Sequence, residues 1–146
     1  MNGKNQKIRV LVIDAQGGGI GRQLVQQIRE TLPQVHITAV GSNTAATAAM
    51  LKAGADTAAT GENSVVVGAR NADFIIGPVG IIIADAMAGE ITPRMALAVA
   101  QSQGQRILIP FNNCDNYIAG VQSGGIGMLI ADAVRELTAR VGSFFG

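Results

Sequence analysis

The first part of the chain shows two different patterns of apolar and polar positions. Residues 8–13 form a nearly continuous apolar run, which is typical of a strand buried on both faces of a parallel sheet. Apolar residues then recur every fourth position from Ile20 to Leu32, while amide and charged side chains occupy the opposite face. This spacing predicts an amphipathic helix over residues 22–32 that packs on the sheet.

The alternation of strand and helix continues toward the carboxyl end. Further strands are predicted at residues 35–41, 56–59, 73–77, 106–111 and 117–121, and further helices at residues 44–53, 80–88, 93–103 and 126–141. Residues 64–71 fit either element: their valines favour a strand, but we prefer a helix because it preserves parallel pairing. The pattern predicts a single α/β domain over residues 1–146, a three-layer, Rossmann-like doubly wound fold with a mostly parallel sheet of five or six strands.

Four glycines, Gly17, Gly18, Gly19 and Gly21, separate the first strand from the first helix. Glycines allow positive φ and close backbone approach, and the N–H groups of a first helical turn suit a phosphate or carboxylate. The dinucleotide pattern G-x-G-x-x-G is not met, because its third glycine position falls on Arg22, and the Gly-Lys-Ser/Thr ending of a P-loop is absent. We therefore expect a nucleotide or other phosphate-bearing small molecule here; the alternative is that the glycines serve packing only.

The residues at the end of the second strand limit which cofactor we expect. Dinucleotide proteins carry an acidic residue there that holds the ribose, whereas this strand ends with Gly41, Ser42 and Asn43. No arginine lies beside them to neutralise a ribose phosphate. Neither NAD nor NADP is specifically supported, although a nucleotide or dinucleotide stays open as the cofactor.

The carboxyl ends of parallel strands define the expected ligand crevice. Asp14 ends the first strand and would repel a phosphate unless a cation or extra N–H groups intervene; alternatively, it accepts hydrogen bonds from the glycine loop and holds it rigid. Glu62, Asn63 and Pro78 are expected at the same edge. The predicted binding residues are Asp14, Gln16, Gly17, Gly18, Gly19, Ile20, Gly21, Ser42, Asn43, Asn112 and Asn113.

Evidence for catalysis is weak. Asp14 and Cys114 are the two candidates, but His36 begins its strand at the opposite edge from Cys114, which disfavours a Cys-His pair. One cysteine and one histidine also exclude a multi-thiolate or clustered imidazole metal site. Arg94 is expected either to reach a ligand or to form a salt bridge with Glu90.

The composition of the chain limits the classes of partner that we expect. Hydrophobic residues make up 48% of the chain and charged residues only 14%, so we expect a homo-oligomer. A net charge of +1 and 3% aromatic residues argue against nucleic acid, and no apolar run is long enough to span a membrane. The polar amino terminus predicts a cytoplasmic protein. A non-catalytic assembly or docking module, using the tail Phe144-Phe145, is the alternative function.

Four motifs together resemble one family: 14–21 (DAQGGGIG), 61–63 (GEN), 77–80 (GPVG) and 109–114 (IPFNNC). Over nearly the whole chain the sequence is similar to an uncharacterised bacterial family, domain of unknown function 3842. The resemblance implies a bacterial cytoplasmic protein and brings no substrate, cofactor or catalytic residue. Similarity to short-chain dehydrogenases is remote, because the Tyr-x-x-x-Lys pair of their active site is absent, which excludes hydride transfer by that mechanism.

Overall fold

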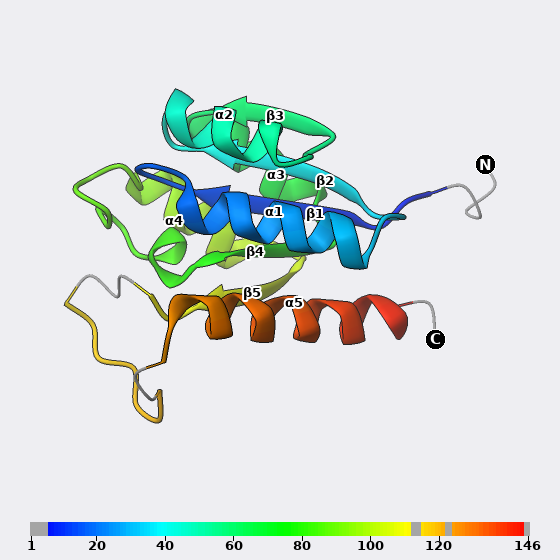
Figure 1. Ribbon diagram of the computed structural model, residues 1–146. Helices are drawn as coiled ribbons and strands as arrows, with labels where there is room; N and C mark the ends of the chain where they lie inside the picture. Colours follow the sequence, from blue (N-terminus) through cyan, green and yellow to red (C-terminus); the bar gives the residue numbers. More distant parts are fainter. Residues whose placement is uncertain (1–5, 112–114, 122–123, 145–146) are drawn as a thin grey trace.

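The computed structural model describes residues 6–111, 115–121 and 124–144 and shows an α/β fold. Five strands form one sheet, and five α-helices pack around it (Figure 1). The strands are β1 Arg9–Asp14, β2 His36–Gly41, β3 Thr57–Thr60, β4 Phe74–Pro78 and β5 Gln105–Ile109. The helices are α1 Gly19–Thr31, α2 Thr44–Lys52, α3 Glu62–Asn71, α4 Pro93–Gln101 and α5 Ile126–Gly142, with the short 3₁₀ helix η2 Val79–Ile82 after β4.

All strand pairs are parallel, in the order β3-β2-β1-β4-β5, which is consistent with a Rossmann-like fold. The chain moves outward from β1 to β3 and then returns to place β4 on the other side of β1. The direction of winding therefore changes between β1 and β4. Ligand crevices of open α/β sheets lie at such a switch point, outside the carboxyl ends of the strands.

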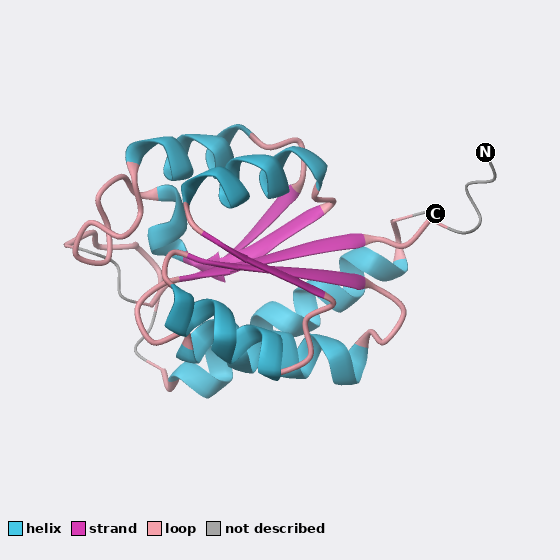
Figure 2. Cartoon of the chain, turned by 90° about the horizontal axis from the view of Figure 1, so that it is seen from above, coloured by secondary structure: helices cyan, strands magenta, loops and turns pink. Residues whose placement is uncertain are grey.

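Helices cover both faces of the sheet (Figure 2). Residues of α1, α2 and α5 form one hydrophobic core with the first face, and residues of α3 and α4 form a second core with the other. β1 contributes to both cores, Val10 and Val12 to the first and Leu11 and Ile13 to the second. This explains the apolar run of the first strand, because a strand covered on both sides has no polar face.

Residues 64–71 are helical, as preferred, and lie within α3. Val65 and Ala69 are buried four residues apart, which gives the helix one face toward the sheet despite the β propensity of valine. In this crossover from β3 to β4, the packing of the helix on the sheet therefore outweighs the strand propensity of its valines.

The helix predicted at residues 80–88 is wrong. Only the 3₁₀ turn η2 forms, and irregular turns follow it. Asp85, Met87 and Ala88 have φ values of 66°, 56° and 57°, in the left-handed region, which a right-handed helix cannot include. Apolar side chains of this segment enter the core at irregular intervals, so tertiary packing replaces the helical repeat.

The sheet has five strands in the described residues, and the sixth strand predicted at residues 117–121 is not present there. Tyr117 is 89% exposed, so this segment has no buried face to offer a sheet. In the part of the chain that the structure describes, no helix has the length and apolarity to cross a membrane.

Candidate functional site

The loops after the strands meet at the carboxyl edge of the sheet, with the glycine loop between β1 and α1 at its centre. Two layers can be distinguished in this loop. The inner layer consists of Asp14, Gly18 and Gly21, which are buried; the outer layer consists of Gly17 and Gly19, which are exposed.

Asp14 holds the inner layer together. The residue is 4% exposed, and its two carboxylate oxygens accept the N–H groups of Ala15 at 2.8 Å and Gly21 at 2.7 Å. Burial raises the pKa of Asp14, while the hydrogen bonds from Gly21 and Ala15 lower it and the charge of Glu90 raises it further. Of the two roles predicted for Asp14, support of the loop by backbone hydrogen bonds is therefore the one that the structure shows.

Gly18 and Gly21 are packing glycines. A Cβ on Gly18 would lie 2.8 Å from the Cα of Ala46, and its φ of 74° is left-handed. A Cβ on Gly21 would lie 2.5 Å from the Sδ of Met50 and 2.8 Å from the Cβ of Asp14. Both positions require glycine so that α1 can approach α2 and the end of β1.

Gly17 and Gly19 have no such requirement. A Cβ at either position would meet nothing within 4 Å, and neither residue has a left-handed φ. The positive φ expected of the loop glycines is confined to Gly18. No described residue accepts a hydrogen bond from the N–H group of Gly17 or Gly19. Neither packing nor backbone conformation explains why these two residues are glycines.

A carboxylate from a distant segment joins the glycine loop to the end of β2. Oε1 of Glu90 accepts the N–H of Gln16 at 2.9 Å, the hydroxyl of Ser42 at 2.5 Å and the side-chain amide of Asn43 at 2.8 Å. The hydrogen bonds from Ser42 and from the Gln16 backbone keep the pKa of Glu90 below its usual value. No hydrogen bond from the described residues reaches Oε2.

Sequence reasoning missed this role of Glu90, since Arg94 was expected either to reach a ligand or to form a salt bridge with Glu90. Arg94 instead lies 3.5 Å from Glu62, at the start of α3. Glu90 is separated from Ser42 by 48 residues, and only the irregular turns after η2 bring them together. A carboxylate from a distant segment thus lies beside the end of β2.

A hollow of about 610 Å³ adjoins the glycine loop. Its lining residues are Gln16, Ile83, Ala84, Asp85, Ala86, Met87, Ala88 and Asp115. Gln16 and Asp115 have φ values of 53° and 65°, so all five non-glycine residues with left-handed backbone in the described chain line this hollow. Left-handed backbone costs about 1–3 kcal/mol per residue and tends to gather at binding sites.

The other predicted site residues have mixed outcomes. Gln16, Ser42 and Asn43 are brought together, and Asn43 also accepts the N–H of Ala46 at 2.9 Å as the N-cap of α2. Ile20 is partly buried and packs against the core of the first face. His36 lies at the amino edge, as predicted, next to Arg9 in the register of β1 and β2.

Part of the predicted site cannot be placed. Asn112, Asn113 and Cys114 lie outside the described residues. Among the residues that are described, no group of three or more histidine, cysteine, aspartate or glutamate side chains is arranged to hold a metal ion.

The chain belongs to the family described as Domain of unknown function (DUF3842), whose model matches residues 9–142. The family resemblance found in the sequence is thereby confirmed. No curated protein and no solved structure matches the chain.

Proposed function

We propose that this DUF3842 protein binds a nucleotide or another phosphate-bearing small molecule at the glycine loop after β1. The observation that carries the proposal is the open space around Gly17 and Gly19. Glycine lets a ligand approach the backbone closely, and exposed N–H groups at the start of a helix attract a phosphate. The hollow lined by left-handed residues supplies adjoining space for the remainder of the ligand.

The charges at this edge specify how a phosphate would be held. Asp14 and Glu90 are both close to the loop, and their negative charges oppose a bare anion. Asp14 faces the inner layer and has both oxygens engaged by N–H groups, which moderates its repulsion. We infer that the phosphate binds together with a divalent cation that the ligand brings with it, as Mg²⁺-nucleotides do.

A non-catalytic assembly module is the second proposal. Leu97 and Met128 are large apolar side chains exposed on α4 and α5, which favours self-association. Phe144 packs its ring against Phe74 at 5.6 Å, so this part of the proposed docking tail contacts its own chain; Phe145 lies outside the described residues. A homo-oligomer, a cytoplasmic location, a bacterial source and the absence of nucleic-acid partners stay predictions from composition and resemblance.

The test is a thermal-shift screen with ATP, ADP, NAD⁺, ribose 5-phosphate and inorganic phosphate, each with and without Mg²⁺. A ligand at about a hundredfold excess over its Kd stabilises by about 2.7 kcal/mol, which corresponds to roughly 5 °C or more for a chain of this size. We expect this shift for at least one nucleotide with Mg²⁺, and its loss in Gly19→Leu, because the leucine side chain would cover the loop.

The matched control is Gly127→Leu, a glycine near the start of α5 that likewise has nothing within 4 Å. The control should keep the full ligand shift. A screen in which no compound raises Tm, or a shift that Gly19→Leu leaves unchanged, would contradict the proposal. Sedimentation of the wild-type chain as a monomer would contradict the assembly module.

A further inference from the structure

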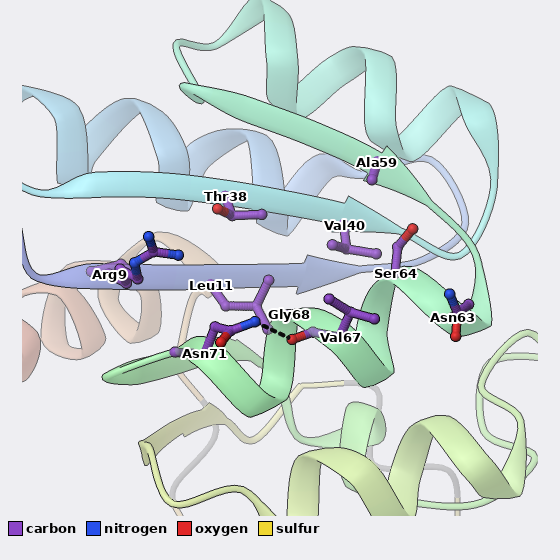
Figure 3. A pocket seen from close by; sticks show the side chains of 12 residues that line it. Arg9, Leu11, Thr38, Val40, Ala59, Asn63, Ser64, Val67, Gly68 and Asn71 are labelled. Carbon is purple, nitrogen blue, oxygen red and sulfur yellow. Dashed lines mark hydrogen bonds between the residues drawn. The ribbon is translucent and has the colours of Figure 1, made fainter.

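A groove of about 370 Å³ runs along α3, between this helix and the strands β1, β2 and β3 (Figure 3). It lies over one face of the sheet rather than at the carboxyl edge. Its floor and walls include Leu11, Thr38, Val40, Ala59 and Val67, and Arg9 lies at its amino end.

The middle of the groove is apolar. Leu11 and Val40 lie at its base but are almost fully buried, at 2% and 1% exposed, so the partly buried Ala59 and the 42% exposed Val67 supply its accessible apolar surface. Gly68 allows α3 to lie directly on the sheet, because a Cβ there would be 3.2 Å from both methyl groups of Leu11. At Gly68 the helix thus contacts the sheet, and the groove lies beside this contact, toward Thr38, Val40 and Ala59 (Figure 3).

The end of the groove at Arg9, near the amino edge of the sheet, is positively charged. No described acidic side chain forms an ion pair with the Arg9 guanidinium, and the carboxylate of Asp73 accepts the backbone N–H of Arg9 at 2.8 Å. Arg9 also lines a second hollow of about 520 Å³, which contains Lys7, His36 and Asp73. His36 lies 3.9 Å from Asp56, so Arg9 and Lys7 are the cations without an acidic partner at this end among the described residues.

Two uncharged polar side chains that line the groove, those of Thr38 and Asn63, form no hydrogen bond with a described residue. Thr38 is partly buried, yet no hydrogen bond from the described residues reaches its hydroxyl. Asn71 is different, because its side-chain amide donates to the carbonyl of Val67 at 3.0 Å (Figure 3). Thr38 is only partly buried, so its hydroxyl is accessible and offers one polar contact to a guest in the groove.

We propose that this groove binds a small amphipathic monocarboxylate, with its carboxylate at Arg9 and its apolar chain beside Ala59 and Val67. Charge complementarity favours an anion, since the residues that line the groove include one cation and no acid. The distance along α3 from Asn63 to Asn71 is about 12 Å at a rise of roughly 1.5 Å per residue, which limits the chain to medium length. This site is separate from the glycine loop, and its test does not depend on nucleotide binding.

The test is NMR titration of the full chain with octanoate, hexanoate, 1-octanol and octylammonium. We expect octanoate to shift the backbone signals of Arg9, Thr38 and Gly68. Each buried methylene is worth about fourfold in affinity, so hexanoate should bind about 15-fold more weakly than octanoate. The neutral alcohol should bind roughly twofold to fivefold more weakly, and the cation more weakly still.

Arg9→Gln should weaken octanoate binding to the level of 1-octanol without changing the affinity for the alcohol. Arg22→Gln is the control, because Arg22 is also exposed but lies on α1, over the other face of the sheet. Ala59→Phe should fill the groove and weaken all four compounds. Equal affinities for octanoate and octylammonium, shifts elsewhere on the protein, no binding, or an unchanged Arg9→Gln would each overturn the proposal.

Discussion

The two layers of the glycine loop differ in what the fold demands of them. In the inner layer, a neighbour determines each residue. Two N–H groups hold the carboxylate of Asp14, and Ala46 and Met50 leave no room for a side chain at Gly18 and Gly21, respectively. In the outer layer, Gly17 and Gly19 have no neighbour within 4 Å of a Cβ. The same residue type thus serves packing in one layer and leaves the backbone exposed in the other.

This difference teaches that a glycine-rich segment need not have one explanation. The packing role accounts for Gly18 and Gly21 and is independent of any ligand. It leaves Gly17 and Gly19 unexplained, and the proposed binding function depends on these two. Variants of the two layers should therefore separate folding from binding.

The largest effect is expected in the inner layer, at Gly21. Gly21→Val should lower the free energy of unfolding by about 3 kcal/mol, because the new side chain would overlap Met50 and Asp14. Urea unfolding followed by circular dichroism measures this loss. Gly127→Val, also near a helix start but in open space, is the control and should cost well under half as much. Equal losses in the two variants would break the distinction between the layers.

Asp14→Asn should cost about 2 kcal/mol at acidic pH, because the protonated carboxyl group still has two oxygens that can accept the N–H groups of Ala15 and Gly21, whereas an amide has only one. The pKa of Asp14 is raised in the folded protein, so its contribution to stability is full below its unfolded pKa and declines as pH rises through the folded pKa. The difference between wild type and variant should therefore shrink from acidic to neutral pH. Urea midpoints at several pH values test this, and a growing difference would contradict it.

Glu90→Gln should cost about 1 kcal/mol at neutral pH, since a neutral acceptor forms weaker hydrogen bonds with Gln16, Ser42 and Asn43. The pKa of Glu90 is lowered by folding, so its contribution is present above the unfolded pKa and is lost as pH falls through the folded pKa. The pH dependence is thus opposite to that of Asp14. The same series of urea midpoints gives both slopes, and parallel slopes would show that the two carboxylates do not differ as described.

The smallest effect is expected in the outer layer. Gly17→Ala and Gly19→Ala should each change the free energy of unfolding by no more than about 0.5 kcal/mol, because both sites have open space and ordinary φ values. Gly18→Ala is the matched inner-layer variant and should cost about 2 kcal/mol from its left-handed φ and the contact with Ala46. A loss of more than 1 kcal/mol at Gly17 or Gly19 would show that these glycines serve the fold.

Most of the fold could be predicted because it follows from local periodicity. The apolar run of β1, the four-residue repeat of α1 and the cap and proline at the start of α4 each lie within a short stretch of sequence. The segment at residues 80–88 failed for the opposite reason. Its conformation depends on left-handed residues and on side chains that pack into a distant core, and neither leaves a repeat in the sequence.

The candidate site was predictable only where it is contiguous. Asp14, Gln16 and the loop glycines follow directly from the end of a strand, as does the Ser42-Asn43 pair after β2. Glu90 could not be assigned, because its place beside Ser42 depends on the path of the turns after η2. The open space that distinguishes Gly17 from Gly18 is likewise a property of the packed molecule.

The uniform direction of the strands has an electrical consequence. Every α-helix returns the chain against the strands, so the backbone dipoles of α1 to α5 add rather than cancel. Basic side chains stand in the last turns at the negative ends of four helices: Arg29, Lys52, Arg70 and Arg140. These four positive charges lie where the summed helix dipole is negative, so they offset part of that dipole in a molecule whose net charge is only +1.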